Sequence, residues 1–414
     1  MKASPGAALA VEVSSVRDEL SRGESLSIVK LLECLVAEAH AVNASDIHID
    51  PSHECVRVRC RVDGVLQEYA SFPKSIHQEV ISRIKVMAAL RTDEHQAAQD
   101  GRFRHLYSDG RFVDVRVSIA PTYHGENAVL RLLADHSEDF TLSMLGFSKE
   151  DCAKIEAAIR KPSGMILSTG PTGSGKTTTL YTLIKMLNSP AVSIVTIEDP
   201  IEYAVRDIEQ IQVNARTGLT FATGLRSILR QDPDIIMVGE IRDGETAGIA
   251  VNTALTGHLL LSTLHTNDAA TTLPRLLDMG IDAYLVASTM NIAIGQRLVR
   301  KICDACKTHE PVTDAVAQSL AHLPLRTPVA VGESLTRGSG CATCKGTGYK
   351  GRLSINEVLV ATPAIREAIL RTASADEIRS IAIEGGMTTM LEDGIQKVRT
   401  GETTIEEVLR VVHD

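Results

Sequence analysis

A glycine-rich loop constrains the fold of this chain more than any other feature. Its residues are Gly170, Pro171, Thr172, Gly173, Ser174, Gly175, Lys176 and Thr177. They match the eight-position phosphate-loop pattern, in which a strand leads into the loop and a helix follows it. An apolar run over 165–169 precedes the loop, and Thr178 continues into a helical pattern. The alternative, a chance glycine-rich turn, does not require either flank. The sequence therefore predicts a nucleotide site between a strand and a helix.

The chemistry of this loop follows from its residue types. Backbone N–H groups in such a loop, together with the positive end of the helix dipole, attract phosphate oxygens. Lys176 is expected to neutralise the β- and γ-phosphates, and the Thr177 hydroxyl is expected to bind Mg²⁺. ATP and Mg²⁺ are the predicted ligands.

Short apolar runs alternate with helical patterns after residue 148. The runs cover 165–169, 193–197, 234–238 and 259–264. Such alternation indicates an α/β fold with a mostly parallel sheet and helices on its faces.

Acidic residues and histidines lie at the ends of these predicted strands. Glu240 follows the strand 235–238, and Glu198 and Glu202 close the strand 194–197. A carboxylate there can hold the Mg²⁺ shell or polarise the attacking water, whereas each acid taken singly can also be a solvated loop charge. His258 and His265 bracket the strand 259–264, as structural histidines or as sensors of the γ-phosphate.

The N-terminal part of the sequence has a different pattern of apolar and polar residues. An amphipathic helix is predicted over 25–42, because apolar residues recur there at helical spacing. Alternating valines and arginines over 56–62 lead into Asp63-Gly64, a hairpin signal, and a second alternating run covers 113–119. These patterns predict a small antiparallel α+β domain.

The chain is predicted to have six segments. They are a flexible tail (1–22), an N-terminal α+β domain (23–135), a linker (136–147), an ATPase domain (148–300), a zinc-binding module (301–352) and a C-terminal helical region (353–414).

Four of the eight cysteines form two Cys-x-x-Cys pairs. They are Cys303, Cys306, Cys341 and Cys344. The spacing suits a structural Zn²⁺ site, with four sulfur ligands and therefore no open position for catalysis. The alternative is two reducible thiol pairs without metal.

Composition argues against some classes of protein. The net charge is −9, aromatic residues make up 3% and Trp is absent, which disfavours a protein that coats nucleic acid. No apolar run reaches the roughly 20 residues that span a bilayer, and no secretory signal is evident. We expect a cytoplasmic protein that meets the membrane through partners.

The ordered motifs resemble those of the type II secretion and type IV pilus assembly ATPase family, over about Ala44 to Glu357. Besides the phosphate loop, the motifs cover 44–50, 99–102, 114–118, 196–202, 225–234, 235–243 and 256–267. The resemblance implies a homo-hexamer whose subunits pair a PAS-like domain with a RecA-like motor domain.

The resemblance also implies roles for single residues. Glu240 resembles the catalytic acid, Glu198 and Glu202 belong to an acidic box, and His258 and His265 to a histidine box. Four arginines are implied to reach the phosphates: Arg116 and Arg131 from the N-terminal domain, and Arg226 and Arg230 from the motor domain. The last two lie at i, i+4 on one helical face. For each arginine the alternative is a solvated surface position.

The implied function is mechanical work for type II protein secretion or type IV pilus assembly. The implied partners are an inner-membrane platform protein and an associated protein with a cytoplasmic domain. The cysteine pairs indicate the secretion and extension branch, and the short region before Ala44 is expected to lack a further docking domain. Alternatives are a pilus-retraction or DNA-uptake motor of the same family, a nucleic-acid translocase, and a nucleotide-binding switch without turnover.

Overall fold

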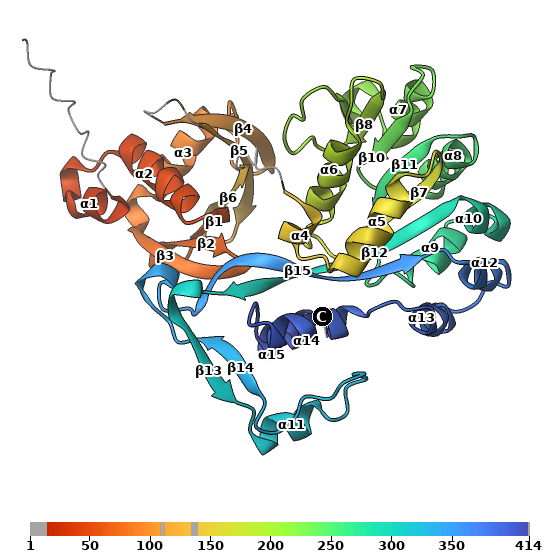
Figure 1. Cartoon of the computed structure of the whole chain (residues 1–414). Helices are drawn as coiled ribbons and strands as arrows, with labels where there is room; N and C mark the ends of the chain where they lie inside the picture. The colour runs from red at the N-terminus through yellow and green to blue at the C-terminus, as the bar shows by residue number, and fades with distance from the viewer. Residues whose placement is uncertain (1–14, 108–109, 111, 134–139, 413–414) are drawn as a thin grey trace, which may run out of the picture. The chain divides into compact units, whose positions relative to one another are not determined.

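The computed structural model describes residues 15–107, 110, 112–133 and 140–412, and the chain divides into two units (Figure 1). The first unit covers Met1–Ser137 and the second covers Glu138–Asp414. Each unit has its own sheet and its own buried core.

The first unit is a six-stranded antiparallel sheet with helices on one face. Its strand order is β3-β2-β1-β6-β5-β4. The elements are α1 (Val16–Ser21), α2 (Ile28–Ala41), β1 (Ala44–Pro51), β2 (Cys55–Val62), β3 (Val65–Pro73), α3 (His77–Met87), β4 (Gln99–Leu106), β5 (Phe112–Thr122) and β6 (Gly125–Leu133).

Alternation along the strands sets the two faces of this sheet. Ile47, Val58 and Val115 are fully buried and pack with apolar residues of α2 and α3 in one cluster. The residues between them point to the opposite face, because successive side chains of a strand alternate. The predicted antiparallel α+β domain is present here.

A helix occupies part of the predicted flexible tail. Residues 1–14 lie outside the described residues, but α1 begins at Val16 with a capping box between Ser15 and Asp18. Val16 and Glu19 are buried, and the Glu19 carboxylate accepts the Ser27 N–H at 2.8 Å. The prediction missed this helix because six residues are too few to show a periodicity.

The second unit is built on a seven-stranded sheet of order β15-β12-β7-β11-β10-β8-β9. All neighbouring strands are parallel except β15, which runs antiparallel to β12. The predicted α/β fold class is thereby confirmed. The strands of this sheet are β7 (Gly164–Thr169), β8 (Ile194–Glu198), β9 (Glu209–Gln212), β10 (Ile235–Val238), β11 (Leu259–Leu264), β12 (Met290–Ile302) and β15 (Tyr349–Val360), and a separate two-stranded sheet is formed by β13 (Lys307–Pro311) and β14 (Ser334–Gly338).

Helices cover both faces of this sheet. On one face, α4, α5 and α6 pack on residues such as Ile166 and Ile294, and on the other face α7 to α10, α12 and α13 pack on residues such as Leu167 and Val238. The helices are α4 (Leu142–Leu145), α5 (Lys149–Ile159), α6 (Lys176–Leu187), α7 (Phe221–Ile228), α8 (Gly244–Leu255), α9 (Thr272–Asp278), α10 (Ala283–Thr289), α11 (Asp314–Leu320), α12 (Pro363–Leu370), α13 (Ala375–Glu384), α14 (Met390–Arg399) and α15 (Ile405–Val412).

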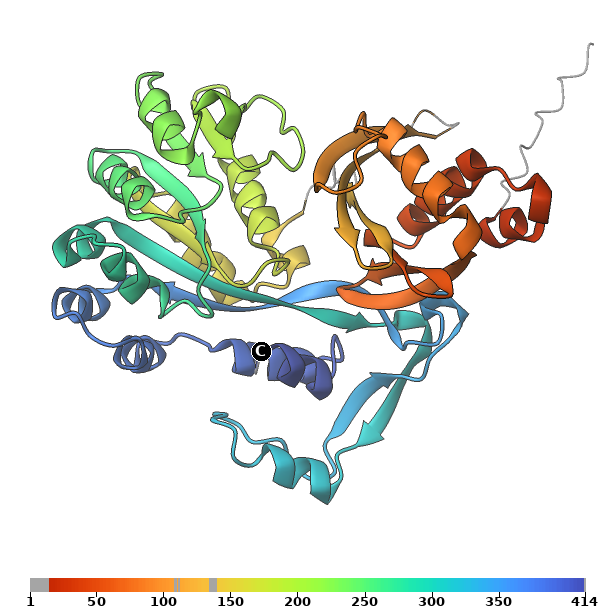
Figure 2. The ribbon, with the colours of Figure 1, turned by 180° about the vertical axis from the view of Figure 1, so that it is seen from behind.

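Two long strands were missed by the sequence analysis. β12 and β15 run side by side, and the hairpin β13–β14 extends from their far end with α11 beyond it (Figures 1 and 2). Both strands cross predicted segment boundaries, since β12 continues past residue 300 and β15 past residue 352. The helices α14 and α15 contact this pair of strands. In the part of the chain that the structure describes, every helix is too short or too polar to cross a membrane.

Candidate nucleotide site and metal centre

The phosphate loop connects β7 to α6. Gly170, Gly173 and Gly175 have φ values of 146°, 79° and 94°, a region that glycine enters without a Cβ clash. At Gly170 there is also no room, because a Cβ would meet Gln296 O and Ser174 Oγ at 2.5 Å. The glycines are therefore required by the shape of this loop.

Lys176 turns back onto the loop that precedes it. Its Nζ donates to Gly170 O at 2.7 Å and to Pro171 O at 2.9 Å, and the residue is 8% exposed. Burial lowers the pKa of Lys176 to about 8, while the negative charge of Glu240 opposes that shift. The ammonium group thus lies where it can exchange two carbonyl oxygens for phosphate oxygens. Thr177 is exposed at the start of α6.

Parallel strands bring the predicted strand-end residues to one edge of the sheet. Thr169 pairs with Leu264, and Val238 pairs with Ile197, so the ends of β7, β11, β10 and β8 are aligned. Glu240 and His265 follow two of these ends and lie at the same edge as the phosphate loop.

The Glu240 carboxylate is held by an arginine and a histidine. Arg242 Nη2 lies 2.6 Å from its Oε1, and His265 Nε2 lies 3.0 Å from its Oε2. The Glu240 side chain is 12% exposed. Arg242 was not predicted, although it stands two residues after Glu240, and the bond to Glu240 raises its pKa.

Glu198 points into the protein on the side of α6. Its carboxylate accepts hydrogen bonds from Tyr181 OH, from Thr196 Oγ1 at 2.6 Å and from Gln210 Nε2 at 3.2 Å. Burial raises the pKa of Glu198, although these hydrogen bonds oppose the shift. Its neighbour Glu202 is exposed. Of the two predicted acids, Glu198 has the bonding of a structural carboxylate.

His258 lies apart from the other predicted residues. It precedes β11, at the end opposite His265, and its Nδ1 lies 3.1 Å from Thr253 O. Six residues of strand separate the two histidines, which corresponds to roughly 20 Å. The structure therefore places His258 and His265 at opposite ends of β11.

The two motor-domain arginines lie on and just after α7. Arg226 Nη2 pairs with Glu245 Oε1 at 2.8 Å, and Arg230 Nη1 donates to Arg226 O at 2.9 Å. Glu245 belongs to the first turn of α8, which begins shortly after Glu240. The Arg226 guanidinium therefore lies at the N-terminus of α8.

Arg116 and Arg131 belong to a row of arginines on the open face of the first unit. Arg102 pairs with Arg116 across β4 and β5, and Arg116 pairs with Arg131 across β5 and β6. The row continues to Asp46 and Arg61. Burial alone would raise the pKa of Asp46, but the bond from Arg131 Nε, at 2.9 Å, helps to hold it below its ordinary value. Like charges directly opposite one another are unfavourable, so this row attracts anions.

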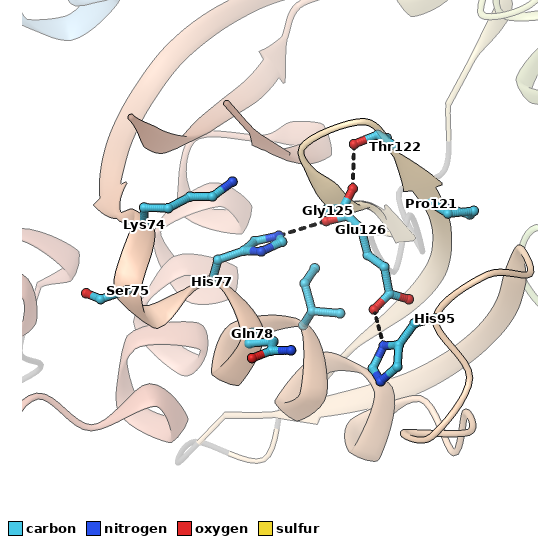
Figure 3. Close-up of a pocket in the computed structure, with 10 residues that line it drawn as sticks. Lys74, Ser75, His77, Gln78, His95, Pro121, Thr122, Gly125 and Glu126 are labelled. Carbon is cyan, nitrogen blue, oxygen red and sulfur yellow. Dashed lines mark hydrogen bonds and ion pairs between the residues drawn. The ribbon is translucent and has the colours of Figure 1, made fainter. Parts of the chain in front are cut away.

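A pocket of about 380 Å³ also lies in the first unit, between the start of α3 and the β5–β6 turn (Figure 3). His77 Nε2 lies 2.8 Å from Glu126 O, and His95 Nδ1 lies 2.8 Å from the Glu126 carboxylate. Lys85 pairs with the same carboxylate at 2.7 Å. The polar groups around Glu126 thus bind one another, and the described residues that line the pocket include none of those predicted from the sequence.

The four paired cysteines converge. Sγ atoms lie 3.9 Å apart for Cys303 and Cys341, 3.8 Å for Cys306 and Cys344, and 3.7 Å for Cys341 and Cys344. Four sulfurs at about 2.3 Å from a tetrahedral Zn²⁺ would be about 3.8 Å apart, so the donor set fits this metal. Cys344 Sγ also accepts the N–H groups of Cys341 and Gly348, at 3.1 and 3.2 Å. Such bonds orient a thiolate ligand.

Strand pairing explains this convergence. β12 and β15 pair up to Ile302 and Tyr349, and β13 and β14 pair from Lys307 and Gly338. Each Cys-x-x-Cys pair lies between two of these strands. These two strand ladders, β12–β15 and β13–β14, therefore hold the two Cys-x-x-Cys pairs close to each other.

Comparisons with known proteins agree with this geometry. The family model described as "Type II/IV secretion system protein" matches residues 22–410. A type II secretion system protein E from Xanthomonas campestris is 46% identical over 403 residues, or 97% of this chain and 70% of that protein. A type IV pilus assembly ATPase, PilB from Thermus thermophilus, is 47% identical over 381 residues, or 92% of this chain and 42% of that protein. The structure of a pilus retraction motor, PilT with bound ADP, has a TM-score of 0.62 at 25% identity and covers 92% of this chain and 97% of that one.

Proposed function

Because the chain belongs to the type II/IV secretion system protein family, we propose that it is the ATPase motor of a type II secretion or type IV pilus assembly machine. The observation that carries the proposal is the edge of the second sheet, where the Lys176 loop and Glu240 lie together. Lys176 would exchange its two carbonyl oxygens for ATP phosphate oxygens here, and the Thr177 hydroxyl would hold Mg²⁺, which supplies charge to the phosphates. Glu240 orients the attacking water, with His265 beside it.

The arginines supply the charge that phosphoryl transfer needs. Arg116 and Arg131 stabilise the developing negative charge on the γ-phosphate, and Arg226 and Arg230 act from the motor domain. Loss of the γ-phosphate on hydrolysis releases this contact, and the movement does work. Glu198, bonded to Tyr181, Thr196 and Gln210, holds the end of β8 in place, and Glu202 follows it on the exposed loop of the acidic box.

The assembly is proposed to be a homo-hexamer at the cytoplasmic face of the inner membrane. It works there on a membrane platform protein and an associated protein with a cytoplasmic domain. The family includes extension and retraction motors, and the four clustered cysteines favour secretion or extension. Zn²⁺ is the proposed metal, and it joins the two strand ladders.

Phosphate release from Mg-ATP by the purified chain tests the proposal. We expect multiple turnovers by the wild type and by Lys185→Ala, which changes a lysine near the other end of α6. Lys176→Ala should lose at least about a hundredfold in rate, because one charged phosphate contact is removed. Turnover by Lys176→Ala at the wild-type rate would remove this loop from the mechanism. DNA-stimulated turnover would instead favour a nucleic-acid translocase.

A further inference from the structure

A chain of buried hydrogen bonds links the C-terminal end of β7 to the C-terminal end of α4. Ser168 Oγ donates to Gln296 Oε1 at 2.9 Å, and Gln296 Nε2 donates to Asn356 Oδ1 at 3.3 Å. Asn356 Nδ2 then donates to Gly146 O at 3.2 Å. Ser168, Gln296 and Asn356 are each at most 1% exposed. We call these four residues the amide relay.

One end of the amide relay is the base of the phosphate loop. Ser168 is the second-last residue of β7, two positions before Gly170. Gly170 packs on the backbone of Gln296 so closely that a Cβ would lie 2.5 Å from Gln296 O. A displacement of the loop when it closes on phosphates is therefore transmitted directly to Gln296.

The other end is the C-terminus of α4. Gly146 caps this helix at a φ of 98°, and Ser354 Oγ donates to Leu145 O at 2.5 Å. In chain order α4 is the first helix of the second unit, and the first unit ends at Ser137. The covalent connection from the first unit thus leads into the helix that the relay holds.

A buried ion pair between Asp393 and Lys397 holds the backbone at Asn356, in the middle of the amide relay. Asp393 Oδ2 accepts the Asn356 N–H at 2.7 Å and pairs with Lys397 Nζ at 2.5 Å. Lys397 Nζ also donates to Ser354 O at 2.7 Å. Because α14 holds Asn356 in this way, a shift of Gln296 cannot be absorbed by free movement of β15.

We propose that Gln296 and Asn356 are positioning residues that transmit nucleotide occupancy of the phosphate loop to α4. This inference rests on the proposed function of the Lys176 loop. A buried amide cannot move without leaving a donor or an acceptor unpaired, which is costly in a core. A displacement of the loop therefore shifts the relay side chains together while the backbone at Asn356 stays in place, and α4 moves with them.

Hydrogen exchange by mass spectrometry on the full chain tests the inference. The probe is ADP with Mg²⁺, the reporter is the peptide over 140–150, and binding is measured in the same samples with a fluorescent ADP analogue. In the wild type, ADP should change the exchange rate of the α4 amides by about fivefold or more. In Gln296→Met and in Asn356→Leu, which keep side-chain volume but lack the amide, ADP should bind while that change is lost.

Asn291→Leu is the matched control. Asn291 is a buried amide on the same strand β12, but it bonds Ser163 O at 2.9 Å and Lys161 Nζ at 3.2 Å at the far end of the strand. This variant should respond to ADP as the wild type does. If Gln296→Met does not fold, Ser168→Ala removes the first donor with a smaller change and should show the same loss.

Three results would overturn the inference. One is an α4 response to ADP that persists in both relay variants. Another is a wild-type chain that binds ADP without any response in α4, in which case the proposed function stands and the relay does not. If the wild type binds no ADP, the proposed function fails and the inference fails with it.

Discussion

Arg242 and Glu240 form an ion pair at the edge of the second sheet, with Nη2 and Oε1 2.6 Å apart. The second carboxylate oxygen of Glu240 faces His265. Both oxygens thus have a partner, so Glu240 is held in one orientation.

The first prediction concerns the charge of Glu240. Glu240→Gln keeps the size of the side chain but removes the carboxylate that orients water, so hydrolysis should fall at least about a hundredfold. Binding of ATP should persist, because Lys176 and the loop are unchanged. Single-turnover phosphate release together with equilibrium binding measures both quantities. Glu156→Gln, at the surface pair with Arg160 on α5, is the control and should hydrolyse ATP normally; equal rates for the two variants would contradict the role of Glu240.

The second prediction concerns pH. Lys176 has a pKa of about 8 in the nucleotide-free chain, against 10.5 ordinarily. Phosphates bind the charged form, so ADP affinity should be about tenfold weaker at pH 9 than at pH 7. The stability of the chain without nucleotide should change with pH in the opposite direction to the affinity. Between pH 8 and 10.5 the unfolded chain binds more protons at Lys176 than the folded chain does, so the free energy of unfolding should rise with pH.

Isothermal titration across this pH range, with Lys176→Arg as the control, measures the effect. Arginine stays charged throughout the range, so the affinity of that variant should not fall between pH 7 and pH 9. A wild-type affinity that is constant over the same range would contradict a titrating Lys176.

The third prediction concerns the hydroxyl group that holds Glu198. Tyr181→Phe leaves one buried carboxylate oxygen without its donor, which should cost roughly 1–3 kcal/mol of unfolding free energy. Urea denaturation measures it, and Tyr284→Phe, at a residue that is 61% exposed, should leave stability unchanged. Equal stability of the two variants would show that Tyr181 does not support Glu198.

The fourth prediction concerns the row of arginines in the first unit. Arg131→Ala should lower the rate of hydrolysis about a hundredfold, as the loss of one donor to a developing charge does. Arg57→Ala, on the same open face but outside the row, should keep the wild-type rate. If both variants lose activity equally, the effect is general and not specific to the phosphates.

The fifth prediction concerns the clustered cysteines. Elemental analysis should find about one zinc per chain, and a strong chelator should make the β13–β14 hairpin sensitive to protease, since the metal joins the two ladders. Cys303→Ser should lose the zinc, while Cys152→Ser, outside the cluster, should keep it. A chain without zinc and with a protected hairpin would contradict the metal site.

Local sequence patterns were enough to predict the main residues of the candidate nucleotide site. The phosphate loop has a fixed spacing, and the strand ends that carry Glu240 and His265 follow from short apolar runs. His258 shows where strand direction matters: it precedes its strand, so in a parallel sheet it must lie at the opposite edge from the residues that follow a strand.

Long-range partners could not be predicted from the sequence. The bonds of Glu198 to Tyr181 and Gln210 depend on how α6 and β9 pack on β8, and nothing in their spacing indicates it. The strands β12 and β15 were missed because Gln296 and Asn356 interrupt their apolar pattern. These two polar side chains are buried because they bond each other, a contact between residues 60 positions apart.

A crystal structure of the chain with Mg²⁺ and a non-hydrolysable ATP analogue tests the central claim most directly. The account predicts that Lys176 Nζ leaves the carbonyl oxygens of Gly170 and Pro171 and lies within hydrogen-bond distance of the β- and γ-phosphates, with Thr177 Oγ1 on the Mg²⁺. A structure in which Lys176 Nζ still donates to Gly170 O, with the analogue absent from the loop or bound elsewhere, would contradict it.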